Sequence, residues 1–194
     1  MRFIDPDSFI QGQQSVIYQN KFQIKKMFSH LSRYQKKISR PPHSIWTNPI
    51  HFIACGFGLG TFPFFPGTIA TLFAILLCLM LSNFSLLFYC VICVLLFVIG
   101  IYCCDVTNKD FGTQDHPAAV FDEIATFPVT LIAIPMTWYF ILIAFILFRF
   151  FDIVKPGPIR WVDQHVHGGL GVMLDDLLAA LATLMLLQLL HFFW

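Results

Sequence analysis

The sequence predicts an all-α fold, a polytopic membrane bundle of four to five apolar helices whose cytoplasmic loops form the functional site. Composition is the first observation behind this prediction. Of the 194 residues, 57% are hydrophobic and only 12% are charged, and the mean hydropathy is +0.73. A soluble domain carries about a quarter charged residues, so this composition is typical of an integral membrane protein.

The second observation is the alternation of long apolar runs with short polar loops. The runs 64–81 and 84–104 are separated only by the link LSNFS, which predicts a hairpin of two antiparallel helices. A third run covers 177–194. Each run is about as long as a helix that crosses a membrane.

The run 124–150 admits two interpretations. Read as one helix, it crosses a membrane once, but Pro128 and Pro135 interrupt it. Proline inside a helix removes a hydrogen bond and kinks or ends the helix. We therefore expect two antiparallel helices, about 117–134 and 138–154, that turn near Pro135, and we keep the single span as the alternative.

The choice between these interpretations decides where the polar loops lie. Three loops rich in glycine and proline flank the apolar runs, at 54–67, 105–123 and 149–176. With a hairpin at 124–150 all three loops lie on the cytoplasmic side and can converge on one site. With a single span the third loop lies on the opposite side, and a site built from all three is excluded.

The charged residues are divided unevenly along the chain. Residues 1–47 carry eight of the 12 basic residues and two of the 11 acidic ones. Apolar residues recur at helical spacing within 21–40, which predicts a basic amphipathic helix on an anionic membrane surface; a loosely ordered basic tail is the alternative. Both interpretations place the N-terminus in the cytoplasm. We expect a basic extension, 1–47, and a membrane domain, 48–194.

The six cysteines do not indicate a metal or redox site. Cys90 and Cys93 form a CxxC pair, but it lies inside an apolar run with no second ligand pair nearby. Buried cysteine usually behaves as a small apolar side chain, and we expect that role here.

The first loop, ACGFGLGTFPFFPGT, has the features of a phosphate contact. Gly58 and Gly60 allow a ligand to approach the backbone closely, and Thr68 lies at the start of a helix whose amides could face an anion. A flexible hinge before a membrane helix is the alternative for this loop.

The second loop ends in DHPAAVFDE and supplies two adjacent acids, Asp122 and Glu123. Such acids suit the first turn of a helix, where they complement the helix dipole. However, Pro117 is the better start for this helix, so we expect the two acids to lie at least one turn inside it. Inside the helix, one of them can bind a metal ion.

The third loop, 148–176, carries the densest set of charged residues. Arg149, Asp152 and Lys155 recur every three residues and so share roughly one face of a helix; a salt-bridged helix end is the alternative. The segment KPGPIRWVDQHVHGG then adds further basic and acidic groups. A glycine-rich turn leads into a last helix, in whose first turn we expect Asp175 and Asp176.

Together the loops hold an excess of carboxylates beside lysine, arginine and histidine. Hard oxygen ligands suit Mg²⁺, whereas the cysteines that a zinc site would favour lie elsewhere. A magnesium ion with basic groups at a membrane surface indicates a lipid that bears a phosphate.

Three blocks of the sequence resemble the bacterial phosphatidylglycerophosphatase A family. They are GFGLGTFPFFPGT, DHPAAVFDE and FRFFDIVKPGPIRWVDQHVHGGLGVMLDDLLAA, and the resemblance covers about 50–194. It implies a Mg²⁺-dependent enzyme of the inner membrane that hydrolyses phosphatidylglycerophosphate to phosphatidylglycerol. Three departures, Leu59, Phe121 and Thr126, look like changes in packing and affect no catalytic carboxylate.

We assign roles to these residues as a hypothesis. The metal ligands are Asp122, Glu123, Asp175 and Asp176, with Asp152 as a further carboxylate. Lys155, with Arg160 or Arg149, binds the phosphate oxygens together with the first loop. His167 either protonates the leaving alkoxide or makes a hydrogen bond that stabilises its loop. A metal-bound water attacks the phosphorus in line, and attack by a carboxylate to form a phosphoenzyme is the alternative.

Two other functions remain open at this point. One is a non-enzymatic Mg²⁺-binding membrane protein, a transporter or an assembly factor. The other is the same chemistry on a different lipid phosphate. The expected partners are phosphatidylglycerophosphate and anionic membrane lipid, with no nucleic acid, and a homo-oligomer is compatible with the sequence.

Overall fold

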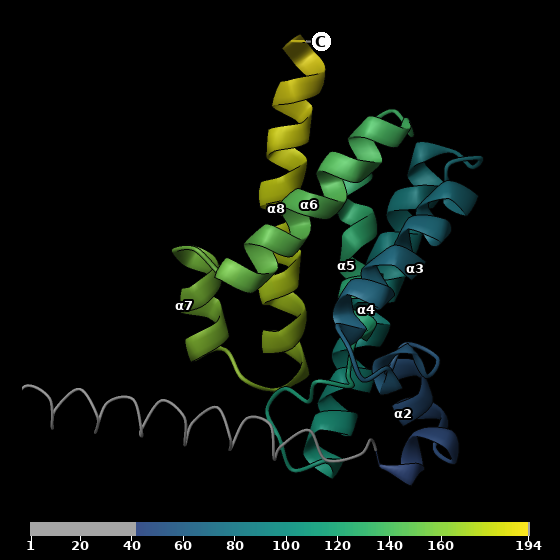
Figure 1. Cartoon of the computed structure of the whole chain (residues 1–194), viewed down its shortest axis with the longest axis vertical. Helices are drawn as coiled ribbons and strands as arrows, with labels where there is room; N and C mark the ends of the chain where they lie inside the picture. Colours follow the sequence, from purple (N-terminus) through teal and green to yellow (C-terminus); the bar gives the residue numbers. More distant parts are fainter. Residues whose placement is uncertain (1–41, 194) are drawn as a thin grey trace, which may run out of the picture. The chain divides into compact units, whose positions relative to one another are not determined.

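The computed structural model describes residues 42–193, and within them the fold is all-α, with no β-strand. Figure 1 shows the course of the chain. The α-helices are α2 (Pro49–Ala54), α3 (Pro66–Leu81), α4 (Leu86–Asp110), α5 (Phe121–Thr126), α6 (Trp138–Val154), α7 (Pro158–His165) and α8 (Gly168–Phe193). Three 3₁₀ helices accompany them: η1 (His43–Trp46), η2 (Leu59–Thr61) and η3 (Phe127–Leu131).

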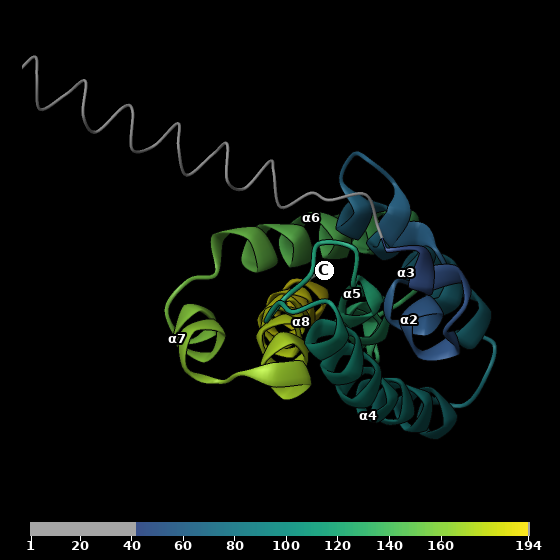
Figure 2. The ribbon, with the colours of Figure 1, turned by 90° about the horizontal axis from the view of Figure 1, so that it is seen from below.

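The last helix, α8, is the element around which the others pack. It contacts α4, α5, η3, α6 and α7, and it is seen nearly end-on among them in Figure 2. The largest group of buried apolar side chains lies between α8 and α6, where Phe127, Phe140 and Phe148 are fully buried. The core therefore lies inside the bundle, and many apolar side chains on the outer helix faces stay exposed.

The two apolar runs after residue 64 form the expected hairpin. Helix α3 ends at Leu81, and Ser85 caps α4 by accepting a hydrogen bond from the backbone N–H of Phe88 at 3.3 Å. Within 42–193, α4 and α8 are long and apolar enough to cross a membrane, while α3 is apolar but shorter. Association with a membrane is therefore compatible with the fold.

The segment 117–154 forms two elements that turn back on each other, as expected. The first element consists of α5 and η3, Phe121–Leu131, and we call it the ascending part. Helix α6 begins at Trp138 and runs back in the opposite direction. The expected first helix, 117–134, is wrong in its extent, because only 121–131 is helical. The residues before Phe121 contact α2 instead of forming a helix. The N–H of Val120 donates a hydrogen bond to the carbonyl of Ala54, the last residue of α2, at 3.0 Å.

Pro128 explains why the ascending part changes from α5 to a 3₁₀ helix. Proline has no N–H and its ring clashes with the preceding turn, so the α-helical bonding cannot continue. Two carbonyls near the end of this segment accept hydrogen bonds from side chains of neighbouring helices. The hydroxyl of Tyr89 donates to the carbonyl of Pro128 at 2.9 Å, and the amide of Gln188 donates to that of Ile132 at 3.0 Å.

Helices α4 and α8 approach each other closely at Gly169. A Cβ atom at this position would lie 2.1 Å from the carbonyl oxygen of Ile101. The N–H of Gly169 donates to the carboxylate of Asp105 at 3.1 Å, so a side chain of α4 caps the start of α8. This contact fixes α8 relative to α4.

The expected basic extension, 1–47, and its amphipathic helix lie mostly outside the described residues. Of that segment, residues 43–46 form η1, in which Ile45 is fully buried against Cys55 and Ala118. Cys93 packs as an apolar side chain beside Leu81, and the described cysteines are all free thiols.

Replacement of Gly169 by alanine is expected to lower the free energy of unfolding by about 1–3 kcal/mol, because the added methyl group forces α4 and α8 apart. Thermal unfolding in detergent measures the effect. The matched control is L170A, since Leu170 is the exposed neighbour on the same turn. Equal melting temperatures for G169A and L170A would show that the close contact does not matter for stability.

Candidate active site

Two of the three polar loops, 105–123 and 149–176, line one cavity of about 110 Å³, and the loop 54–67 approaches its lining residue Glu123 through Gly67. The cavity lies at the end of the bundle where α4 ends and α5 and α8 begin. That volume is several times what one water molecule needs, so it can hold an ion and part of a substrate. The cavity is lined by Asp115, His116, Pro117, Ala119, Val120, Asp122, Glu123, Asp152, Lys155, Val172, Asp175 and Asp176.

Three carboxylates form the innermost group of the cavity. One oxygen each from Asp122, Glu123 and Asp176 lies within 4.8 Å of the other two. Asp122 and Asp176 are buried, with 8% and 4% of their surfaces exposed. The second oxygen of Glu123 and Oδ2 of Asp176 are buried and have no hydrogen-bond partner within the described part of the chain. Unpaired buried acceptors are costly, so this group is suited to a cation.

The helix positions of the two acid pairs differ from the prediction. Asp122 and Glu123 lie in the first turn of α5, because the helix starts at Phe121 rather than at Pro117. Asp175 and Asp176 lie two turns inside α8, because that helix already starts at Gly168. Asp105 caps α8 by accepting a hydrogen bond from the N–H of Gly169. The glycine-rich segment, which the sequence predicted as a loop, therefore forms the first turns of α8.

Arg149 connects two of the carboxylates. Its Nη1 atom lies 3.3 Å from Oε1 of Glu123 and 2.9 Å from Oδ2 of Asp152. Gly67, in the first turn of α3, leaves room for this arrangement, since a Cβ atom there would lie 2.1 Å from Oε1 of Glu123 and 3.3 Å from Nη1 of Arg149. The first loop thus contributes to the site through Gly67.

Lys155 joins α6, α7 and α8 at the other side of the cavity. It ends α6 in a left-handed conformation with φ of 46°. Its Nζ atom donates to Oδ1 of Asp163 at 2.6 Å and also to the carboxylate of Asp175. Burial alone would lower the pKa of Lys155, but the hydrogen bonds to both carboxylates outweigh it and raise this pKa. Lys155 is therefore a cation at neutral pH.

The cavity carries more negative than positive charge. Six carboxylates line it, whereas Lys155 is the one lysine or arginine among the lining residues and Arg149 contacts two of the acids from outside. Close carboxylates that cannot all be neutralised by neighbours repel one another and resist ionisation. A divalent cation removes this repulsion, and hard oxygen donors are the ligands that Mg²⁺ prefers.

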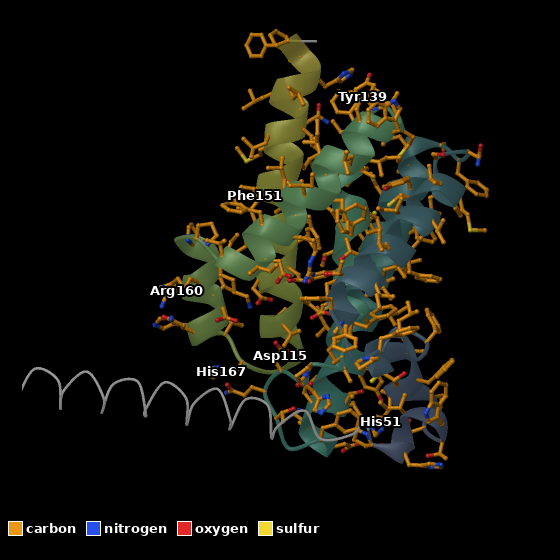
Figure 3. All side chains as sticks on the ribbon, in the orientation of Figure 1. His51, Asp115, Tyr139, Phe151, Arg160 and His167 are labelled. Carbon is orange, nitrogen blue, oxygen red and sulfur yellow. The ribbon has the colours of Figure 1, made fainter. Side chains whose placement is uncertain are left out.

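A second, wider cavity adjoins the first. The two share Asp115, Val172 and Asp175, and Asp163 and His167 also line the second one. Figure 3 shows Asp115 and His167 at the same end of the molecule. Asp115 and Asp163 were not predicted from the sequence to have a role in the site. Both lie inside the blocks that carry the family resemblance, and that position was the signal that could have found them.

Besides Arg149, which contacts two lining acids from outside, four residues predicted to bind phosphate or assist catalysis line neither cavity: Gly58, Gly60, Thr68 and Arg160. A Cβ atom on Gly58 would meet Trp46, and one on Gly60 would meet the carbonyl of Ala118, so both glycines allow close packing. Arg160 lies on the outer side of α7, as Figure 3 shows. Phosphate contact through these four residues stays a prediction.

Comparisons with known proteins agree with the site. The family model for phosphatidylglycerophosphatase A matches residues 52–191. The chain is 38% identical to phosphatidylglycerophosphatase A of Escherichia coli over 149 residues, which cover 76% of this chain and 87% of the relative. It is 43% identical to the Haemophilus influenzae protein of the same name over 136 residues, 69% of this chain and 83% of the relative.

A Bacteroides thetaiotaomicron protein named "Putative phosphatidylinositol-3-phosphatase" is 38% identical over 143 residues, which cover 70% of this chain and 89% of the relative. No solved structure matches the chain. The family match includes every carboxylate of the cavity. The chain therefore belongs to the phosphatidylglycerophosphatase A family and is a phosphatase.

Proposed function

We propose that this enzyme hydrolyses phosphatidylglycerophosphate to phosphatidylglycerol and inorganic phosphate, as a step of phospholipid synthesis in the bacterial inner membrane. The observation that carries the proposal is the carboxylate-rich cavity, with Lys155 and Arg149 at its sides, in a member of this family. The names of the relatives from Escherichia coli and Haemophilus influenzae support this substrate.

The residues of the cavity fit Mg²⁺ as the cofactor. Asp122, Glu123 and Asp176 would hold the ion, because their oxygens lie close together and two of these oxygens lack partners. Asp175 would serve as a further ligand or as the anionic partner of Lys155. The ion would supply electrostatic stabilisation of the phosphoryl oxygens.

The other side chains orient the substrate and move a proton. Lys155 and Arg149 bind phosphoryl oxygens that the carboxylates would otherwise repel. An oxygen of water forms a bond to phosphorus and gives one proton to a carboxylate of the cavity, while the bond from phosphorus to the glycerol oxygen breaks. The leaving oxygen needs a proton, and His167, in the second cavity, is the side chain that we assign to supply it.

The membrane placement is part of the same proposal. Helices α4 and α8 cross the bilayer, and α3 and the pair η3–α6 complete a multi-pass bundle. The N-terminus and the carboxylate cavity face the cytoplasm, since the basic residues concentrate before residue 48. The boundary of the membrane domain at residue 48 belongs to this proposal.

Another lipid phosphate is the second candidate substrate, and the name of the relative from Bacteroides thetaiotaomicron favours it. Phosphate release by purified protein in detergent micelles distinguishes the candidates. The substrates are phosphatidylglycerophosphate, phosphatidylinositol 3-phosphate and phosphatidate, each with and without Mg²⁺. Release from phosphatidylglycerophosphate alone supports the proposal, while preference for another substrate keeps the chemistry and changes the substrate. A folded protein that releases no phosphate from any of them contradicts both.

Replacement of Asp176 by asparagine tests the metal site. We expect kcat to fall by roughly 100-fold, because the change removes one charge from the group that holds the cation. Mg²⁺ should raise the melting temperature of the wild-type protein, since a ligand that binds only the folded state stabilises it. The same addition should leave the melting temperature of D176N nearly unchanged.

The matched control for this experiment is D110N. Asp110 is an exposed carboxylate that pairs with His51 outside the cavity. D110N should keep the Mg²⁺-dependent rise in melting temperature. A D176N protein that responds to Mg²⁺ as the wild type does would remove Asp176 from the ligand set.

Lys155→Met separates the structural role of Lys155 from its role in phosphate binding. The change leaves Asp175 buried without its cation and is expected to cost about 3 kcal/mol of stability. The double variant K155M/D175N should regain part of this stability and still lack activity.

K109M is the control, because Lys109 pairs with Asp105 at the surface with 72% of its side chain exposed. Loss of this pair should cost less than about 1 kcal/mol of stability. Chemical unfolding gives the stabilities, and recovery of activity in the double variant would exclude Lys155 from phosphate binding.

A further inference from the structure

An aromatic surface lies beside the site and has no role in the proposed chemistry. It joins η1, α2, the loop that contains η2, and the outer side of α3. We call it the aromatic strip. Its members are Trp46, Phe52, Phe57, Phe62, Phe64, Phe65 and Phe73.

Four of these rings form a continuous row. The ring centroids of Trp46 and Phe52 lie 6.0 Å apart, those of Phe52 and Phe57 5.8 Å, and those of Phe57 and Phe73 6.2 Å. Phe73 belongs to α3, so the row connects the segment before α2 to a helix of the bundle. These four rings therefore form one ordered surface, and Phe62, Phe64 and Phe65 lie in the loop between Phe57 and α3.

The strip is open to its surroundings. Phe64 and Phe65 expose 75% and 79% of their surfaces, and Trp46 exposes 61%. The segment 52–67 contains no charged residue. Large exposed apolar patches mark sites of contact with a membrane or with another protein.

The backbone turns two of these rings outward in a conformation that is rare for bulky residues. Phe57 and Phe65 have φ angles of 58° and 49°, in the left-handed region. Hydrogen bonds hold both positions, since the N–H of Phe57 donates to the carbonyl of Phe52 at 2.9 Å and the carbonyl of Phe65 accepts from Ile69 at 3.2 Å. An ordered, costly backbone that exposes phenylalanine indicates a function for the exposed rings.

The strip continues the apolar outer face of the bundle. Leu72 and Leu76, which expose 50% and 58% of their surfaces, follow it along α3. At the other end of the same helix, Phe65 precedes Pro66 and Gly67, and Gly67 touches Glu123 and Arg149. The strip thus lies where the apolar outer face ends and the carboxylate site begins.

We infer that the aromatic strip lies in the boundary between headgroups and acyl chains of the bilayer, on the side of the carboxylate cavity. This inference rests on the proposed membrane placement of α4 and α8. Aromatic rings favour this boundary, and a segment without charges offers nothing to a polar partner. Seated there, the strip holds the start of α3, and with it Gly67 and its contacts to Glu123 and Arg149, at the depth of lipid phosphates.

Quenching by brominated lipids tests the placement of the strip. The protein is placed in phosphatidylglycerol–phosphatidylcholine vesicles with bromine near the headgroup or near the chain end. In one variant Trp46 is the only tryptophan, and in two others the native tryptophans are phenylalanine and either F64W or V94W is added. Val94 lies in the middle of α4 with 62% of its surface exposed.

We expect Trp46 and F64W to be quenched mainly by the shallow bromines and V94W by the deep ones. Quenching of V94W without quenching of F64W would overturn the inference and leave the proposed membrane placement intact. Absence of quenching at both positions would overturn the membrane placement and the inference with it. Protection of F64W from both bromines and aqueous acrylamide would show that a second copy of the chain covers the strip, and would also overturn the inference.

Activity on two forms of the lipid gives an independent test in the native sequence. The double variant F62S/F64S should raise the KM for phosphatidylglycerophosphate in vesicles by about tenfold, because apolar contact with the bilayer is lost. Its kcat/KM for a dispersed short-chain substrate should stay unchanged. F84S is the control, since Phe84 is equally exposed in the link between α3 and α4. An unchanged KM in vesicles, or an equal loss on both substrates, would contradict the role of the strip.

Discussion

Repulsion among the buried carboxylates is the constraint on which the rest of the structure depends. Six acids face one cavity, and two cations, Arg149 and Lys155, lie among them. Each cation is shared between two acids, so each also ties helices together: Arg149 joins α6 to α5, and Lys155 joins α6 to α7 and α8. The ion pairs that reduce the repulsion among the carboxylates therefore also hold the helices around the cavity in their arrangement.

Glycine and proline allow the helices to reach this arrangement. Gly67 lets α3 approach the pair Glu123–Arg149. Gly169 lets the backbones of α8 and α4 come into direct contact. Pro128 ends the α-helical bonding of the ascending part, and side chains of α4 and α8 donate hydrogen bonds to the carbonyls of Pro128 and Ile132 near its end. Packing density at these points leaves little freedom for the carboxylates, which is the condition for a preorganised site.

Much of this could be predicted from the sequence, and the failures share one cause. Two long apolar runs with a short link predicted the hairpin α3–α4, and Pro128 and Pro135 predicted the turn before α6 at Trp138. The starts of α5 and α8 were predicted wrongly. In both places a residue distant in the sequence sets where the helix begins. The carbonyl of Ala54 accepts a hydrogen bond from Val120, so α5 begins only after it, and Asp105 caps Gly169, so α8 begins earlier than predicted. The grouping of Asp122, Glu123 and Asp176 was expected, whereas the contact of Gly67 with the site depends on packing that no local pattern encodes.

The shortness of the ascending part has a consequence for the lipid around the protein. From Phe121 to Leu131 the chain rises through 11 helical residues, a length of about 16–22 Å, whereas the hydrocarbon core of a bilayer is about 30 Å thick. In the proposed membrane placement this short segment needs no adjustment of the bilayer, because neighbouring helices bury most of its side chains and keep lipid away from it. Lipid would then meet the exposed apolar faces of α3, α4 and α8, while the short segment that carries Asp122 and Glu123 stays within the protein.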